Sequence, residues 1–338
     1  MERKSPNRYC GKFTCVDNTE HKWLFPVFRT LLHSLKVCFF NTSLKKEVQK
    51  QFVQKPSFPQ RSQEPKITWL GHATFLIQIG GKNIITDPIL GSLSFVFQRL
   101  VPSVVTVKDL PPIDYIVISH NHLDHMDSKT LQDIKQQSPS VRVLVPMGDK
   151  AWFDYHNFVY ASEHLWWDEI IDPFVKDLKF TFLPANHWSQ RTLFDKNKSL
   201  WGSWMIQLGD YKIYFAGDTS WGNHFEQIGQ EFQNIDIACM PIAPGEPRKW
   251  MKDSHIDARE AVKAFIKLKA RIFIPMHWGT FHLGLDNFYT PINLLKQSWQ
   301  EFMSELSSKE LRLLKFGELV TDVRYKFIST IKSVQKAV

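Results

Sequence analysis

From about residue 66 onward the chain alternates short apolar runs with turn residues. Three early runs predict strands at Ile67–Leu70, Phe75–Ile79 and Asn83–Thr86, and Gly80–Gly81 predicts the hairpin turn between the last two. The same pattern predicts further strands at Tyr115–Ile118, Val141–Val145, Lys179–Leu183, Trp204–Leu208, Lys212–Ala216, Ile235–Met240 and Arg271–Pro275, with helices at Ser128–Gln137 (Ser128 as its cap) and Asp257–Lys269. Hairpin pairs mixed with crossover helices favour a four-layered αβ/βα sandwich with two mixed β-sheets over a doubly wound parallel sheet.

The N-terminal region has a different pattern. Trp23–Phe40 carries apolar residues at three- and four-residue steps, which predicts an amphipathic helix. This helix either packs on the main domain or a second subunit, in a homodimer, or lies on a membrane surface with its basic residues near the headgroups. The predicted organisation is an extension at 1–65 that ends in a proline-containing linker, a catalytic domain at 66–320 and a basic tail at 321–338. Near the tail, Glu310–Leu314 is predicted to be helical and Leu319–Val320 to be a short strand.

Composition narrows the class of protein. The 338 residues carry a formal net charge of +8, which favours anionic partners such as a phospholipid surface. The sequence has no uninterrupted apolar stretch of transmembrane length. Its four cysteines show no paired metal-knuckle spacing, which favours a reduced protein. We therefore expect a cytoplasmic, peripherally membrane-associated protein, with export by an unrecognised signal left open.

The densest chemistry lies just after the predicted strand at Tyr115–Ile118. There the sequence runs Ser-His-Asn-His-Leu-Asp-His, with His120, His122, Asp124 and His125 in one short loop. So many imidazoles beside a carboxylate are hard to satisfy in a core, whereas they suit Zn²⁺ and related ions. This string resembles the metal-binding signature of the metallo-β-lactamase superfamily.

Three further candidate ligands have the order and setting of that superfamily, each at a strand end: His187, Asp218 and His277. Seven ligands suit two metal ions, zinc or another divalent metal. We expect His120, His122 and His187 on one ion, Asp124, His125 and His277 on the other, and Asp218 between them. A hydroxide held by both ions would be the nucleophile, because metal binding lowers the pKa of water. The resemblance also implies that Asp87 orients a histidine ligand.

Longer motifs narrow the family. They are W-L-G-H-A-T at 69–74, L-P-P-I-D at 110–114, H-W-S-Q-R-T-L at 187–193, L-W-G-S-W at 200–204, E-P-R at 246–248 and H-W-G-T-F at 277–281. Together they resemble the N-acylphosphatidylethanolamine-hydrolysing phospholipase D family over roughly residues 65–318. The resemblance implies a two-zinc enzyme that works at membranes and releases phosphatidic acid and an N-acylethanolamine.

Several other residues are candidates for the same site. The resemblance places His255 where it would steady or protonate the leaving oxygen, beside the catalytic Asp87, Asp124 and Asp218. Arg191 and Arg248 either clamp a phosphate or pair with surface carboxylates. Trp188 and Trp278, with other tryptophans of these loops, either line an acyl groove or fill the core. His72 is expected to support its strand rather than to bind a metal. The apolar 91–105 loop is expected either near the active-site mouth or the lipid surface, or buried under the domain.

The leading hypothesis is thus a zinc-dependent phospholipase D-type phosphodiesterase that acts on a membrane phospholipid. One alternative is a metallo-hydrolase of another phospholipid, a soluble phosphodiester or a lactone. A weaker alternative is a non-catalytic lipid- or partner-binding protein, which the retention of all seven candidate ligands disfavours. No basic insertion separates the ligands, so nucleic acid is not expected as a partner.

Overall fold

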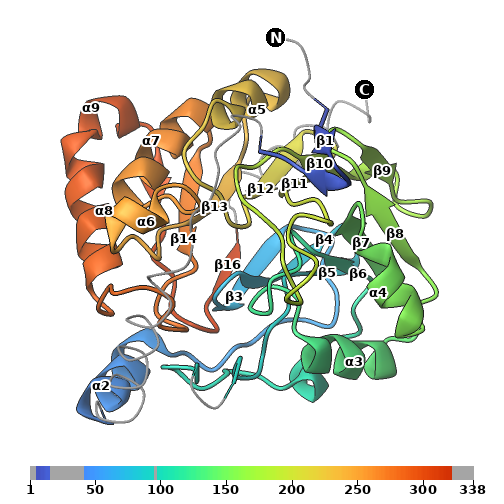
Figure 1. The fold of residues 1–338 in the computed structure, drawn as a ribbon. Helices are drawn as coiled ribbons and strands as arrows, with labels where there is room; N and C mark the ends of the chain where they lie inside the picture. Colours follow the sequence, from blue (N-terminus) through green and yellow to red (C-terminus); the bar gives the residue numbers. More distant parts are fainter. Residues whose placement is uncertain (1–4, 16–41, 95–96, 322–338) are drawn as a thin grey trace, which may run out of the picture.

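Two seven-stranded β-sheets lie face to face in the computed structural model, which describes residues 5–15, 42–94 and 97–321 (Figure 1). The first sheet has the order β16-β3-β4-β5-β6-β7-β8 and the second the order β15-β14-β13-β12-β11-β10-β9. The first comprises β3 (Lys66–Gly71), β4 (Thr74–Ile79), β5 (Lys82–Thr86), β6 (Tyr115–Val117), β7 (Arg142–Pro146), β8 (Ala161–His164) and β16 (Leu319–Thr321). The second comprises β9 (Glu169–Ile171), β10 (Leu178–Leu183), β11 (Ser203–Leu208), β12 (Tyr211–Phe215), β13 (Ile237–Pro241), β14 (Ile272–Met276) and β15 (Glu310–Leu311).

Both sheets are mixed. In each, one half is built from antiparallel hairpins and the other half from parallel strands joined by crossovers. The carboxyl ends of the parallel strands β5, β6 and β7, and of β12, β13 and β14, are the places where loops can bring side chains together. The sequence-predicted fold, a four-layered αβ/βα sandwich with two mixed sheets, is therefore confirmed.

Helices cover the outer faces of the sandwich. α3 (Ser128–Gln137) and α4 (Lys150–Tyr155) pack on the first sheet. α7 (Ala258–Leu268) covers the second sheet and contacts both α5 (His224–Phe232) and α8 (Thr290–Glu301). The shorter elements are α2 (Thr42–Phe52), η1 (Val107–Asp109), α6 (Arg248–Met251) and α9 (Met303–Leu306).

The covered faces explain why the strands are apolar almost throughout. In β4, Phe75 and Ile77 point into the core between the sheets, whereas Leu76 packs in the cluster under α3 and α4. Because successive side chains of a strand point to opposite faces, a sheet buried on both sides needs apolar residues at every position. Each fully buried large apolar side chain contributes roughly 1.5–3 kcal/mol to stability.

Two local predictions are wrong. The first turn of α3 is capped by Asp127, whose side chain accepts a hydrogen bond from the Thr130 amide, and not by Ser128. Glu310–Leu314 is not a helix, because Glu310–Leu311 forms the edge strand β15 and pairs with Ile272–Phe273 of β14. There the backbone hydrogen bonds of a neighbouring strand outweigh the local helix preference of the segment.

Parts of the N-terminal extension pack on the main body. The hairpin of β1 (Arg8–Tyr9) and β2 (Lys12–Phe13) leads to the buried Cys15, whose Sγ donates to the His187 carbonyl at 3.0 Å. At the end of α2, the Phe52 ring lies 5.8 Å from that of Trp278. The predicted amphipathic helix at 23–40 and the basic tail after residue 321 lie outside the described residues.

Among the helices formed by the described residues, none is both long and apolar enough to cross a bilayer.

Candidate metal centre

The seven predicted ligands come together at one end of the sandwich. They follow four strands that are far apart in sequence: β6 carries the 120–125 loop, β10 is followed by His187, β12 by Asp218 and β14 by His277. Five of the seven side chains expose almost none of their surface, whereas His122 and Asp124 are partly exposed. The fold thus collects imidazoles and carboxylates from both sheets into one buried cluster.

One group consists of three histidines. His120 Nε2 lies 2.8 Å from His122 Nδ1, which lies 3.3 Å from His187 Nε2. Desolvation lowers the pKa of His122 to about 4 and holds the pKa values of His120 and His187 well below the ordinary range. Neutral imidazoles carry one N–H each, so three converging ring nitrogens cannot satisfy one another fully. A cation at their meeting point resolves this conflict.

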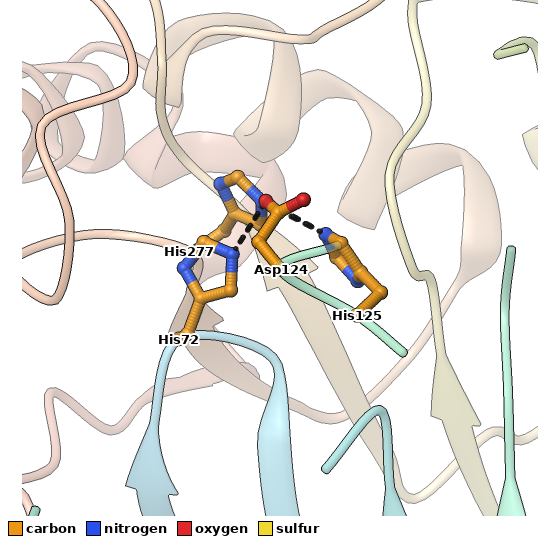
Figure 2. A group of neighbouring side chains, drawn as sticks. All are labelled: His72, Asp124, His125 and His277. Atoms are coloured by element: carbon orange, nitrogen blue, oxygen red, sulfur yellow. Dashed lines mark hydrogen bonds and ion pairs between the residues drawn. The ribbon is translucent and has the colours of Figure 1, made fainter. Parts of the chain in front are cut away.

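A second group lies beside the first (Figure 2). His125 Nε2 and His277 Nε2 are 3.1 Å apart, and Asp124 Oδ2 lies 3.4 Å and 3.6 Å from these two nitrogens. Burial opposes protonation of His277, but Asp218 and Asp124 outweigh it and raise its pKa to about 9. The same carboxylates raise the pKa of His125 above its usual value against the effect of burial.

Asp218 reaches both groups. Its Oδ1 lies 3.1 Å from His277 Nε2, and its Oδ2 lies 3.3 Å from His125 Nε2 and 3.9 Å from His187 Nε2. Burial raises the pKa of this carboxyl, yet the neighbouring His277 and His125 hold it well below its ordinary value, so Asp218 is an anion. It occupies the position between two groups of three donors that the sequence predicts for a bridging ligand.

Hydrogen bonds behind the cluster fix which nitrogen faces it in three of the rings, those of His120, His125 and His187. Asp87 Oδ2 lies 2.7 Å from His125 Nδ1 and accepts from Ser119 Oγ at 2.5 Å. Ser119 Oγ in turn lies 2.9 Å from His120 Nδ1. The Ser254 carbonyl lies 2.9 Å from His187 Nδ1. With the Nδ1–H groups directed outward, the Nε2 lone pairs point to the centre, as metal ligation requires. Asp87 therefore stands where its predicted orienting role needs it.

The backbone around the cluster is held in unusual conformations. His72, Asp87 and His277 have positive φ angles of 53°, 33° and 62°. Gly217, at φ +59°, lies so close to Ser119 that an added Cβ would be 2.5 Å from the Ser119 Cβ. Left-handed backbone at residues other than glycine is costly and gathers at functional sites.

The donors fit a divalent metal centre. The groups His120–His122–His187 and His72–Asp124–His125–His277 each have ligand atoms within 4.8 Å of one another. Buried polar atoms such as His277 Nδ1 and His122 Nε2 have no hydrogen-bond partner among the described residues. Imidazole nitrogen with carboxylate oxygen is the donor set of zinc and neighbouring ions.

His255 lies at the edge of this cluster. It is 8% exposed, and its Nδ1 is 3.6 Å from Asp218 Oδ2. Desolvation and the neighbouring His277 lower its pKa to about 4, so its ring is neutral at pH 7. A neutral imidazole in this position can donate one hydrogen bond into the site.

The guanidinium groups of the two candidate phosphate clamps, Arg191 and Arg248, already have hydrogen-bond partners within the protein. Arg191 donates to the Met126 carbonyl at 2.8 Å and to Ser128 Oγ at 2.6 Å. Arg248 bonds Glu260 at 2.6 Å and the His255 carbonyl at 2.9 Å. These contacts brace the loops that carry His187 and His255. Any phosphate contact by the two arginines stays a prediction.

The two candidate tryptophans differ in their surroundings. The half-buried Trp188 packs edge-on against His122, with ring centroids 4.1 Å apart, so it borders the metal cluster. Trp278 is 1% exposed and packs among Trp69, Phe288 and Phe316. Its surroundings are those of the core alternative, with its outer edge at a small cavity beside His277.

The apolar 91–105 loop divides in two. Leu100 and Val101 are buried, whereas Ser92 and Ser94 are exposed. Arg99 is buried within the loop and donates to the Ile89 and Val101 carbonyls. Desolvation lowers its pKa to about 10. The second half of the loop therefore lies under the domain, which was one of the two alternatives.

Sequence reasoning missed two residues of the centre. Ser119 links Asp87 to His120, and His72 contacts Asp124 directly, whereas the sequence favoured strand support over metal binding for His72. The glycine–histidine pair at the end of β3 was the one available signal for His72.

Replacing Asp87 by asparagine tests the outward hydrogen bonds. An asparagine that still accepts from the Ser119 amide turns its NH₂ toward His125 Nδ1, which forces the ring proton onto Nε2. We expect Asp87→Asn to weaken binding of one metal ion about 10- to 100-fold in competition with a chelator. The buried Asp149→Asn, whose carboxylate accepts from Asn121, is the matched control. Wild-type metal affinity in Asp87→Asn would contradict this role.

Comparisons with known proteins agree with the fold and the donor cluster. A family model of the β-lactamase superfamily domain matches residues 82–278. The chain is 36% identical over 244 residues to N-acyl-phosphatidylethanolamine-hydrolyzing phospholipase D 1 of Caenorhabditis elegans, covering 68% of each chain. It is 30% identical over 255 residues to the mitochondrial enzyme of the same name in Saccharomyces cerevisiae, covering 72% of this chain and 54% of the yeast protein.

A solved structure shares the fold. Igni18, a metallo hydrolase from Ignicoccus hospitalis, superposes with a TM-score of 0.58 at 22% identity, covering 76% of this chain and 98% of that one. The superfamily match and the nematode relative agree with a metal site at the buried cluster of histidines and aspartates. This chain belongs to the N-acylphosphatidylethanolamine-hydrolysing phospholipase D family of the metallo-β-lactamase superfamily, and it is a metal-dependent hydrolase.

Proposed function

We propose that this hydrolase cleaves N-acylphosphatidylethanolamine on the headgroup side of its phosphodiester. Water adds its hydroxyl to phosphorus, the bond from phosphorus to the ethanolamine oxygen breaks, and that oxygen takes a proton. The products are phosphatidic acid and an N-acylethanolamine. The observation that carries the proposal is the pair of donor groups joined by Asp218, in a chain whose relatives are named for this hydrolysis.

The proposed cofactor is a pair of divalent ions, with zinc favoured by the nitrogen-rich donor set. His120, His122 and His187 would hold one ion, Asp124, His125 and His277 the other, and Asp218 both. When bound, such ions acidify water and offset negative charge on phosphoryl oxygens.

The remaining residues act on the substrate and on the ligands. His255, whose Nδ1 lies 3.6 Å from Asp218 and whose ring is neutral, would donate a hydrogen bond to the leaving oxygen. Trp188 gives the site an apolar wall beside His122. Arg191 keeps the His187 loop against the 120–125 loop through the Met126 carbonyl.

Metal uptake by the metal-free protein should release protons. The pKa of His277 is raised to about 9 and that of His125 is also raised, so both rings are protonated at pH 7, and a metal ligand must give up that proton. We expect about two protons per chain from these residues when zinc binds at pH 7, and fewer above pH 9. Calorimetry in buffers of different ionisation enthalpy measures this number. Release that does not fall with rising pH would contradict the assignment.

The activity test is hydrolysis of N-acylphosphatidylethanolamine in mixed micelles by zinc-loaded protein, with products resolved by mass. We expect phosphatidic acid and N-acylethanolamine, and a loss of at least about 1,000-fold in kcat for Asp218→Asn. Phosphatidylcholine and phosphatidylethanolamine are the control lipids, and a soluble bis-phosphodiester is the control diester. Cleavage of the soluble diester alone would retain the metal centre and reject the lipid as substrate.

Access to a lipid substrate requires contact with a membrane, and the loops around the centre expose apolar side chains. We call Leu123, Leu193, Phe194 and Trp221 the apolar rim. Leu193 and Phe194 are 85% and 82% exposed, and Leu123 and Trp221 are 55% and 41% exposed. All four lie on the loops that carry candidate ligands, and the basic Arg191, Lys196 and Lys198 belong to the same loop as Phe194. Apolar tips beside basic residues are typical of a surface that inserts into anionic bilayers.

Replacing a rim residue by aspartate tests the membrane contact. We expect Phe194→Asp to reduce sedimentation with anionic phosphatidylserine-containing liposomes at least about 10-fold, because it places a charge where an apolar ring would insert. Phe174→Asp is the matched control. Phe174 is 77% exposed but lies beside Lys82 and Arg142. These two residues begin β5 and β7, so Phe174 lies near the amino ends of the strands, whereas the metal cluster lies at the carboxyl ends. Equal sedimentation of both variants and wild type would reject the rim.

A further inference from the structure

Besides His255 at the edge of the cluster, His72 is the histidine there that the predicted ligand set does not include. It lies in the turn between β3 and β4, and its side chain is 1% exposed. Figure 2 shows the ring beside His277 with its Nε2 directed at Asp124. The Nε2–Oδ2 distance is 2.9 Å, and the centroids of the two imidazole rings are 3.9 Å apart.

The backbone of His72 is fixed from several sides. Its amide donates to Thr280 Oγ1 at 2.6 Å, and its carbonyl accepts from the His277 amide at 3.1 Å and from Trp69 Nε1 at 3.0 Å. The turn is therefore bound to the segment that carries His277. Phe281 packs edge-on against the ring at 5.1 Å, so the imidazole has little freedom to rotate away.

The chemistry of the contact sets the position of the proton. An ionised carboxylate can only accept hydrogen bonds, so the proton of the His72–Asp124 contact resides on Nε2. A nitrogen that carries this proton has no lone pair to offer a metal. His72 therefore differs from His125 and His187, whose Nδ1 atoms face protein acceptors and whose Nε2 atoms face the centre.

The same oxygen of Asp124 also faces the two histidines of the second group. Oδ2 lies 3.4 Å from His125 Nε2 and 3.6 Å from His277 Nε2. A carboxylate oxygen has two lone pairs, one of which the His72 N–H occupies. Asp124 has 15% of its side chain open to solvent, so the protein around it does not hold this ligand on every side and a hydrogen bond from His72 fixes its orientation.

We propose that His72 is a positioning residue of the metal centre: its Nε2–H holds Asp124 so that the carboxylate faces His125 and His277, and it thereby strengthens binding of the metal ion at that group alone. The inference rests on the proposed two-metal centre. Among the described residues, no hydrogen bond or ring contact joins the His72 side chain to the His120–His122–His187 group, so its effect is confined to one ion.

Two substitutions separate positioning from the alternatives. His72→Phe keeps an aromatic ring against His277 and Phe281 but removes the donor, whereas His72→Gln retains an N–H in a similar position. Both substituted residues would adopt the left-handed backbone of His72, so the conformational strain is the same in the two variants. We expect His72→Phe to bind one zinc ion about 10- to 100-fold more weakly and the other as tightly as wild type, with His72→Gln close to wild type.

The measurement is a zinc titration of the full chain against a chromophoric chelator, without any assay of turnover. Wild-type protein that binds no zinc would refute the proposed metal centre rather than the role of His72. When wild type binds two ions, unchanged affinity in His72→Phe would reduce His72 to a packing residue. Equal losses in His72→Phe and His72→Gln would make it a ligand.

A measurement on wild type makes the test independent of how well the variants fold. In zinc-loaded protein labelled with ¹⁵N-histidine, correlations between ring protons and nitrogens report which nitrogen carries the proton. We expect the His72 ring to carry its proton on Nε2 and the His125 ring to carry its proton on Nδ1. A His72 ring with Nε2 deprotonated and metal-shifted would overturn the proposal.

Discussion

Six histidine rings and two carboxylates share one small buried volume between the ends of two sheets, and the rest of the structure serves that cluster. A neutral imidazole has one N–H, so rings whose N–H points away from the cluster face one another with lone pairs alone. Buried carboxylates are costly unless a positive charge lies beside them. The metal-free protein meets the second need by protonating His125 and His277 beside Asp124 and Asp218. Divalent ions meet both needs at once, which is the physical reason to identify the cluster as a metal centre.

The layer behind the cluster decides which atoms face it. Asp87, Ser119 and the Ser254 carbonyl are hydrogen-bonded to the outward-facing nitrogens of three histidine ligands. His72 supports a carboxylate ligand, Asp124, in the same way. Each support comes from a different part of the chain than the ligand it contacts, except for the neighbours Ser119 and His120. The two sheets must therefore be docked before the ligands can be oriented, so the packing of the sandwich and the geometry of the centre depend on one another.

The surroundings of the centre join the catalytic cluster to its proposed lipid substrate. The loops that hold ligands also carry the apolar rim, and Arg191 binds the Leu193–Phe194 loop to the loop of His122. A buried thiol from the N-terminal segment, Cys15, donates to the carbonyl of His187 itself. The N-terminal extension is thus part of the support of the site, which its irregular polar sequence did not indicate.

The sequence by itself determined most of the strands of the two large sheets, though not β8, β9 or β15, together with the helices α3 and α7 and the class of chemistry. Apolar runs of strand length show where both faces of a sheet are buried, and a string such as H-x-H-x-D-H is too rich in ligands for any ordinary loop. It could not assign local features that depend on a neighbour. Glu310–Leu311 became a strand because β14 offered it hydrogen bonds, and Asp127 rather than Ser128 capped α3.

Only the tertiary structure decided the supporting contacts. An arginine is positively charged whether it binds a phosphate or pairs within the protein, so the sequence could not separate the two roles of Arg191 and Arg248. Their hydrogen bonds to Met126 and Glu260 form only in the folded chain. His72 and Asp124 lie 52 residues apart, and nothing in either local pattern announces their contact. Residue type decides which side chains can bind a metal, and the sequence shows it directly. The orientation of those side chains depends on contacts between distant segments, and these contacts form only when the two sheets pack.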